Sequence, residues 1–276
     1  MHTKTLKALD LPGAYEEFQA WPPELTEGLA RHVLSSLREP PRQCLVLGAA
    51  TGVNDALPLA RLADPGDRIL AGDVEPSFLA RLHDRALAEG LRNVEAQRID
   101  ITEDLSPLGR FDLVTLLFVI HRLKNWESVV DRLSVLVAPG GSFFISEFSG
   151  PSGIIYLSNE NGGSASDPVS RLIQRYFAFL PDRFAPPLKS TSIGPVRSRL
   201  GTLLDFQEHR DFTWKQSITT AEMLRRIEER AYAPFFSTHP SPDLLSRLRA
   251  EFAGQSEQRV ELHETIRVFR FARPQR

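Results

Sequence analysis

The sequence predicts an α/β protein in which a doubly wound sheet of seven mainly parallel strands is covered by helices. Two observations support this class. Between about Gln43 and Phe148, short runs of β-branched residues and leucines alternate with longer segments of helical periodicity, as in a parallel sheet with helical crossovers. The run Leu113–Ile120 contains no charged residue, and strands buried on both faces have this composition.

The elements of this part alternate regularly along the chain. The expected strands are Gln43–Leu47, Arg68–Asp73, Asn93–Arg98, Asp112–Val119 and Ser142–Glu147, and the helices between them are Asp55–Leu62, Pro76–Glu89 and Trp126–Val137. Pro76 stands at the start of its helix and Gly90 follows the end, which is the usual punctuation of helix termini. Residues 41–149 are therefore expected to form the core of the sheet.

A further helix is expected before the first strand. After Pro22 and Pro23, apolar residues recur at every fourth position, at Leu25, Leu29, Val33 and Leu37. This spacing places them in one stripe along a helix. We expect residues 1–40 to form an N-terminal helical cap, with Glu16 and Glu17 on a solvated helix face.

The chain changes character after Phe148. Residues 150–202 are rich in glycine, serine and asparagine and then contain several prolines, with helices expected at Val169–Phe179 and Gly194–Leu203; they are interpreted as a helical insertion before the last two strands. The expected elements of residues 203–276 are Leu204–Trp214, Thr220–Arg230, Pro242–Phe252 and Arg259–Phe271. The first and last of these are strands, and the last is expected to close the sheet because its apolar residues alternate with period two. Residues 1–276 are interpreted as a single domain.

Composition excludes several classes of protein. The 276 residues are 42% hydrophobic and 25% charged with a formal net charge of −2, so the basic field of a nucleic-acid-binding protein is absent and no nucleic-acid partner is expected. The single cysteine, Cys44, cannot form an intramolecular disulfide, and no metal site is expected. We find neither a bilayer-spanning apolar run nor a signal peptide, so we expect no membrane partner and a cytoplasmic protein. The sequence does not predict an oligomeric state.

Two segments indicate a ligand that contains a nucleoside. The first expected strand runs into Gly48-Ala49-Ala50-Thr51-Gly52 and then into a helix. Glycines at this turn let the backbone approach a ligand, and the helix N-terminus favours polar groups. Asp73 ends the second strand 21 residues after Gly52, close to the offset of about 20 residues at which an acidic side chain binds a ribose hydroxyl.

Two cofactors fit these segments, a nicotinamide dinucleotide and S-adenosylmethionine (SAM). A dinucleotide site needs Gly-x-Gly-x-x-Gly, whereas this chain has Ala50 at the third position and Val53 at the sixth. Besides the glycine loop and Asp73, three segments bear on this choice: Phe111–Val114, Leu117–His121 and Val137–Gly141. Together, these features resemble instead the class I SAM-dependent methyltransferases, which have a Rossmann-like fold. More loosely, Phe212–Trp214 and Thr219–Leu224 resemble small-molecule methyltransferases related to trans-aconitate methyltransferase.

The resemblance implies roles for individual residues. Asp73 would bind both ribose hydroxyls, Asp100 would contact the adenine amine, and His121 would be the catalytic residue that removes or orients the acceptor's proton. The cofactor-binding residues it implies are Gly48, Ala49, Ala50, Gly52, Asp73, Val74, Asp100, Ile101 and Phe118. The family usually has a carboxylate where this chain has Val46, and Asp55 and Glu16 are the candidate replacements.

The resemblance also implies an activity. Residues 41–149 would bind SAM, residues 150–202 would form a substrate lid, and the methyl acceptor would be an oxygen or nitrogen of a small organic molecule. Two other functions remain open. One is a non-catalytic binding or regulatory protein on the same scaffold, suggested by Val46 and Ala50, and the other is an NAD(P)-dependent oxidoreductase.

Several of these residues also have a purely structural interpretation. Asp73 could cap the helix that begins near Pro76, and Asp100 could form a turn with its own loop. His121 could be a hydrogen-bonded structural histidine, and Phe118 could belong to the core.

Overall fold

The computed structural model describes residues 10–117, 119–120, 123, 125–149, 171–172, 193–228, 242–255 and 257–275. Its helices are α1 (Leu11–Gln19), α2 (Pro23–Ser35), α3 (Ala56–Leu62), α4 (Pro76–Ala88), α5 (Trp126–Leu136), α8 (Ile193–Leu203), α9 (Thr220–Glu228) and α10 (Pro242–Phe252). Its strands are β1 (Gln43–Leu47), β2 (Arg68–Asp73), β3 (Val94–Arg98), β4 (Phe111–Leu116), β5 (Val137–Ser149), β6 (Asp205–Thr219) and β7 (Arg259–Ala272).

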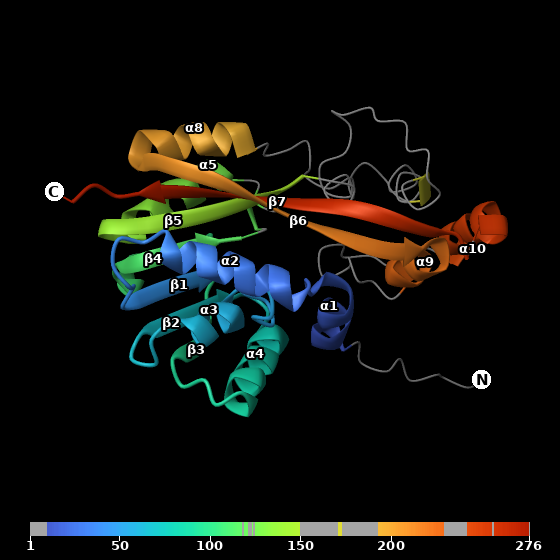
Figure 1. Cartoon of the computed structure of the whole chain (residues 1–276), viewed down its shortest axis with the longest axis horizontal. Helices are drawn as coiled ribbons and strands as arrows, with labels where there is room; N and C mark the ends of the chain where they lie inside the picture. Colours follow the sequence, from blue (N-terminus) through green and yellow to red (C-terminus); the bar gives the residue numbers. More distant parts are fainter. Residues whose placement is uncertain are drawn as a thin grey trace.

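The seven strands form one sheet in the order β3-β2-β1-β4-β5-β7-β6 (Figure 1). The first five pair in parallel, while β7 pairs antiparallel with both β5 and β6. The chain runs outward from β1 to β3 and then returns to β4 on the other side of β1, so β1 and β4 flank the switch point where such sheets bind ligands. The predicted fold class is confirmed.

The last strand lies at a different position in the sheet from the one that we expected. β7 was expected to close the sheet, but it lies between β5 and β6, and β6 forms the edge. The burial of side chains explains this order. Ile266 and Val268 of β7 lie in the α2 and α3 core and Phe269 lies in the core on the other face, so β7 is buried on both faces as an internal strand is, whereas most of β6 is exposed.

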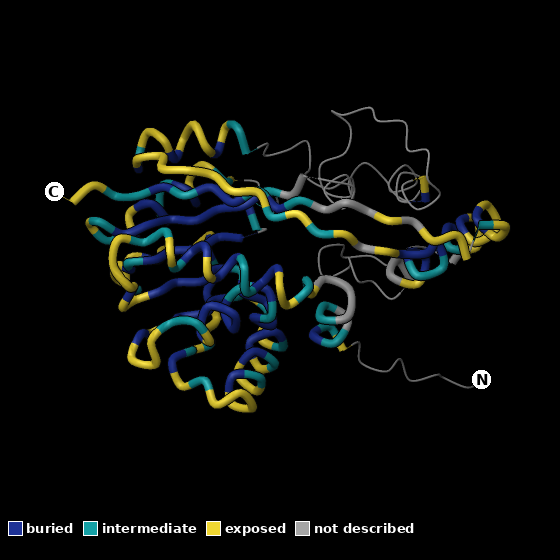
Figure 2. The backbone as a smooth tube through the Cα atoms, in the orientation of Figure 1, coloured by how far each residue is buried: buried dark blue, intermediate teal, exposed yellow. Residues whose placement is uncertain are grey.

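Helices cover both faces of the sheet. On one face, α2, α3 and α4 pack against apolar side chains that include Cys44 and Val46 of β1. On the other, α5 and α8 pack against a second core that includes Leu45 and Leu47. Successive residues of β1 therefore face opposite cores, and the sheet around this strand is coloured mainly as buried (Figure 2).

The sequence-derived insertion lies largely outside the described residues. Of residues 150–202, the structure describes Arg171, Leu172 and the helix α8, which begins one residue before its expected start. Within the described part of the chain, no helix is long and apolar enough to cross a membrane.

Candidate cofactor site

The loop between β1 and α3 has a backbone shape that the sequence requires. Gly48 has φ of +69°, and a Cβ added there would clash with the Val119 side chain. The amide N–H groups of Gly48 and Ala49 both donate to the carbonyl oxygen of Gly72 in β2, at 2.8 and 3.0 Å. Ala50 also has a positive φ, +46°, in a region where residues with a Cβ are strained. The loop is thus held tightly against the carboxyl end of β2.

Asp73 connects this loop to β2 directly. Its Oδ2 accepts a hydrogen bond from the Ala50 N–H at 2.9 Å, and its Oδ1 accepts one from the Glu75 N–H at 3.0 Å. The N-cap of α4 is Glu75, whose carboxylate accepts from the Ser77 N–H at 3.0 Å. The alternative in which Asp73 caps this helix is therefore wrong.

Asp73 retains capacity for a ligand. Each carboxylate oxygen can accept about two hydrogen bonds, and each oxygen of Asp73 uses one for the protein contact described above. The side chain is partly exposed at the end of β2. Fixed by two backbone groups, it can still accept hydrogen bonds from two hydroxyls.

The neighbouring strand places the other expected adenosine contacts. Asp100 follows β3, and its Oδ1 accepts from both the N–H and the hydroxyl of Thr102, at 2.9 and 2.6 Å. These bonds from Thr102 hold the pKa of the Asp100 carboxyl below its ordinary value. Asp100 thus forms a turn with its own loop, as its structural interpretation proposed. Its second carboxylate oxygen, Oδ2, remains able to accept hydrogen bonds from other groups. Val74 is 51% exposed, while Ile101 is buried in the core beside α5, so Val74 is the better placed of the two to contact a ligand.

Two residues singled out by the sequence analysis, Phe118 and His121, lie outside the described residues. They follow β4, whose expected end at Val119 is observed at Leu116. The roles implied for both remain predictions.

The helix α1 packs beside the loop through contacts that the sequence analysis missed. The Asn54 amide donates to the Tyr15 hydroxyl at 3.2 Å and accepts from the Trp21 N–H at 2.9 Å. The Tyr15 ring packs on Phe78 of α4, with ring centroids 5.3 Å apart. The one available signal was the position of Asn54, two residues after the glycine loop.

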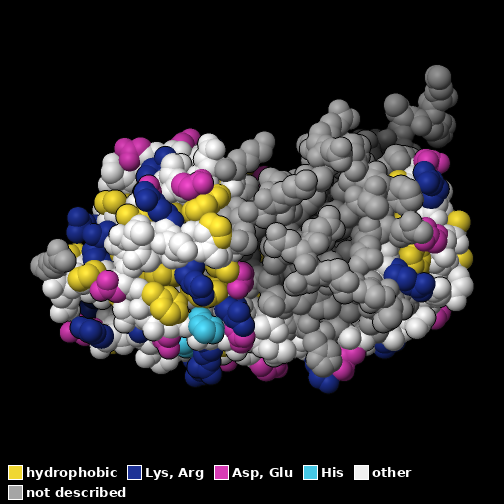
Figure 3. Space-filling view, turned by 90° about the horizontal axis from the view of Figure 1, so that it is seen from above, with side chains coloured by type: hydrophobic (Ala, Val, Ile, Leu, Met, Phe, Trp, Pro, Cys, Tyr) yellow, Lys and Arg dark blue, Asp and Glu magenta, His cyan; other side chains and the backbone are white. Residues whose placement is uncertain are grey.

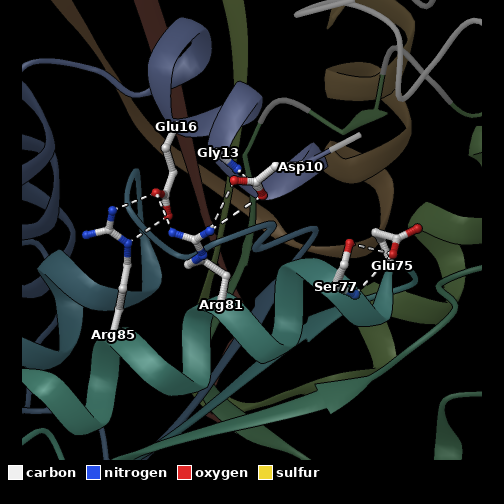
Figure 4. Close-up of polar contacts among 7 residues, drawn as sticks. All are labelled: Asp10, Gly13, Glu16, Glu75, Ser77, Arg81 and Arg85. Carbon is white, nitrogen blue, oxygen red and sulfur yellow. Dashed lines mark hydrogen bonds and ion pairs between the residues drawn. The ribbon is translucent and has the colours of Figure 1, made fainter. Parts of the chain in front are cut away.

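Ion pairs fasten α1 to α4 (Figure 4). Arg85 binds both carboxylate oxygens of Glu16 at 2.7 and 2.6 Å, which raises the pKa of its guanidinium. Arg81 adds weaker contacts to Glu16 and Asp10, and Asp10 caps α1 by accepting from the Gly13 N–H. The expectation that Glu16 is merely solvated is wrong, and its bidentate pairing leaves it poorly suited to replace the carboxylate absent at Val46.

Asp55, the other candidate replacement, lies between the loop and α3. Its Oδ1 accepts from the Ala56 N–H at 2.5 Å. Burial raises the pKa of the Asp55 carboxyl to about 7, with a further contribution from the nearby charge of Asp73. Such a group is partly protonated near neutral pH and becomes fully charged when a cation binds beside it.

The charged side chains of the described residues can be compared with the patterns of metal sites and of polyanion-binding surfaces. The described residues contain no cluster of three or more histidine, cysteine or acidic side chains that could hold a metal ion. On the face shown in Figure 3, the described basic and acidic side chains are interspersed.

Comparison with known proteins finds a family model that matches part of the chain. Residues 45–143, which carry the loop, Asp73 and Asp100, match the family model described as a methyltransferase domain. These residues are similar to methyltransferases. The resemblance to class I methyltransferases drawn from the sequence is thereby confirmed, while the closer likeness to trans-aconitate methyltransferases remains a prediction.

Individual relatives of the methyltransferase domain agree. The chain is 31% identical over 123 residues to a demethylmenaquinone methyltransferase of Thermus thermophilus, covering 44% of this chain and 54% of that protein. It is 30% identical over 138 residues to the ubiquinone/menaquinone biosynthesis C-methyltransferase UbiE of Pseudomonas putida, covering 49% of each. The chain thus spans about half the length of the curated relatives it matches. Among solved structures, YcgJ from Bacillus subtilis shares the fold, with a TM-score of 0.56 at 16% identity over 90% of this chain and 98% of that one.

Proposed function

We propose that the protein transfers a methyl group from SAM to a small organic molecule. One observation carries the proposal: within the matched methyltransferase domain, Asp73 is hydrogen-bonded to Ala50 of the glycine loop. This bond holds the carboxylate that would bind the ribose hydroxyls next to the backbone turn that a ligand can approach closely.

The residues present fit SAM. The Gly48 turn has no room for a side chain, so a ligand can contact its backbone. Asp73 would bind the ribose hydroxyls, and Val74, 51% exposed, would offer apolar surface to the adenine ring. When bound, SAM supplies an electrophilic methyl group on its sulfonium sulfur.

The protein's contribution to the chemistry would be mainly positioning. Holding the acceptor atom in line with the methyl group supplies several kcal/mol of rate enhancement without a covalent intermediate. In the proposal, residues 150–202 cover the acceptor and His121 removes or orients its proton. Residues 1–40 complete the site through the contacts of α1 with Asn54.

The acceptor atom is the finer part of the proposal. The sequence analysis favours oxygen or nitrogen, whereas UbiE is named as a C-methyltransferase of quinone biosynthesis. We therefore propose a small hydroxylated aromatic compound as the first acceptor to test, because it can accept a methyl group on either oxygen or a ring carbon.

Two measurements test the proposal. Calorimetric titration should show binding of S-adenosylhomocysteine and none of NADH. Incubation with SAM labelled in its methyl group should transfer label to a phenol, a catechol or a hydroquinone, and mass spectrometry of the product identifies the methylated atom. Binding of NADH alone would support an oxidoreductase, and binding of S-adenosylhomocysteine without transfer to any acceptor would support the non-catalytic alternative.

A further inference from the structure

A small cavity lies on the α2 and α3 side of β1 and β4. Its volume is about 10 Å³, enough for one group of the size of a water molecule. Most of its lining is apolar, including Leu29, Leu59 and Val46, but four polar residues also face it: Thr26, Asn54, Asp55 and Thr115. A cavity this small with several polar groups is suited to a single polar atom with its hydrogens.

The polar groups of this cavity can accept further hydrogen bonds. Thr115 is 3% exposed, and its hydroxyl oxygen has no hydrogen-bond partner, which is costly in a buried site. No basic side chain among the described residues forms an ion pair with Asp55, whose carboxylate accepts from the adjacent Ala56 N–H. The Thr26 hydroxyl donates to the Pro23 carbonyl at 3.0 Å, so its lone pairs remain able to accept.

The cavity adjoins the candidate cofactor site. Asp55 lies three residues beyond Gly52, and Asn54 beside it contacts Tyr15. Val46 and Thr115 are direct partners in the β1–β4 register, so the cavity occupies the sheet's switch point. Leu117, which follows β4, completes the lining.

We propose that Asp55 and Thr115 bind the ammonium group at the amino-acid end of SAM, a role that rests on the proposed function. An ammonium group has the size of a water molecule, three donors and no acceptor. A carboxylate and two hydroxyl oxygens supply three acceptors for it, and its charge compensates the buried carboxylate. Glu16 is excluded from this role by its bidentate pair with Arg85.

The test compares two ligands that differ at this end. S-adenosylhomocysteine carries the amino acid, and 5′-methylthioadenosine lacks it while retaining the adenosine. Asp55→Asn keeps a side-chain oxygen that can cap α3 but removes the charge, and should weaken S-adenosylhomocysteine about 10- to 150-fold, the range for a hydrogen bond to a charged group. Binding of 5′-methylthioadenosine should change less than about 2-fold.

Two further variants sharpen the result. Thr115→Val removes the unpartnered hydroxyl at nearly constant volume and should weaken only S-adenosylhomocysteine. Asp131→Asn, at an ion pair between α5 and α8 on the opposite face, is the matched control and should leave both affinities unchanged. Melting curves of each variant without ligand confirm that it is folded.

The outcomes separate the two proposals. Equal losses for both ligands in Asp55→Asn, or no loss for either, would overturn the ammonium assignment while the proposed cofactor stands. Failure of the unaltered protein to bind either ligand would overturn the proposed function itself.

Discussion

The parallel strands β1–β5 and the hairpin β6–β7 belong to one sheet but are held by different forces. In β1, every residue after Gln43 is buried, and β4 is buried at five of its six positions. In β6, residues 205–211 are all exposed, and ion pairs such as Asp211–Arg267 and Lys215–Glu261 connect it to β7. The difference teaches that strands such as β1 and β4, beside the candidate cofactor site, are fixed by apolar packing on both faces, while the exposed edge strand β6 depends on its backbone ladder with β7.

The hairpin also extends beyond the rest of the sheet (Figure 1). β5 pairs with β7 only as far as Thr265, whereas β6 continues to pair with it to Arg259. The helices α9 and α10 lie at this far end. Substitutions in β6 should therefore alter global stability less than equivalent substitutions in the buried parallel strands.

Removing one phenylalanine from each region tests this contrast most strongly. Phe144 of β5 is fully buried against the α2 and α3 core, so Phe144→Ala should lower the free energy of unfolding by about 3–5 kcal/mol. Phe206 of β6 is 47% exposed and contacts Phe271 edge-on at 5.6 Å, so Phe206→Ala should cost roughly 1 kcal/mol or less. Urea denaturation of both variants measures the difference, and equal losses would contradict the contrast.

The same contrast explains which parts of the fold the sequence could predict. The bounds of β1 and β2 are as predicted, because continuous apolar runs mark strands buried on both faces. β5 begins at Val137 instead of Ser142, since Pro139-Gly140-Gly141 has the composition of a turn yet lies in the strand beside a register shift with β4. β6 continues to Thr219, five residues beyond the prediction, where exposed polar residues give no periodic signal.

The sequence predicts which positions form the candidate site, but it does not predict which residues contact one another there. Asp73 and the glycine loop could be found because their spacing follows the strand-to-helix turns of the fold. The bond from Ala50 to Asp73, the Asn54–Tyr15 contact and the pairing of Glu16 with Arg85 join residues 23 to 69 positions apart. Such contacts depend on how helices pack on the sheet, which no local pattern encodes.

The second largest effect is expected at Asp73, where substitution should weaken ligand binding. Asp73→Ala removes the charged acceptor for two hydroxyls, so S-adenosylhomocysteine affinity should fall by about 1.5–3 kcal/mol, or roughly 10- to 150-fold. Asp73→Asn should lie between. Stability without ligand should also fall, by about 1–3 kcal/mol, because the N–H groups of Ala50 and Glu75 lose their acceptor.

Glu75 provides the matched control for Asp73, since it lies two residues away and caps α4. Glu75→Ala should cost about 1 kcal/mol of stability, the usual value for a lost N-cap, with ligand affinity nearly unchanged. The reverse pattern, in which Glu75→Ala impairs binding and Asp73→Ala does not, would remove Asp73 from the cofactor site.

The packing between the parallel strands and β6 can be tested at His32 through the pH dependence of stability. This buried histidine of α2 lies between Phe144 of β5 and Phe212 of β6, at ring distances of 6.3 and 5.6 Å. Burial lowers the pKa of His32, Arg210 and Arg270 lower it further, and Glu208 opposes them. Below the ordinary histidine pKa of about 6.5, the unfolded chain therefore binds a proton that the folded protein resists.

Stability should consequently be full above pH 6.5 and decline as the pH falls from there to the lowered pKa, levelling off below it. His32→Gln cannot titrate, so the difference in unfolding free energy between the two proteins should shrink or reverse with acidification over this window. Denaturation at a series of pH values provides the measurement. Parallel curves for the two proteins would show that His32 does not contribute to the pH dependence.

The smallest effect is expected at the Asp211–Arg267 pair of the hairpin, although its geometry is good. Arg267 donates to both carboxylate oxygens of Asp211 at 2.7 Å, and both side chains are more than a third exposed. Arg267 lowers the pKa of the Asp211 carboxyl through this bond, but water and salt screen the pair, so a double-mutant cycle with Asp211→Asn and Arg267→Gln should give a coupling of about 0.2–1 kcal/mol. The coupling should weaken further in high salt. A value of several kcal/mol would show that surface pairs, in addition to the backbone ladder, hold β6 to the sheet, and the distinction between the two regions would then be smaller than their burial indicates.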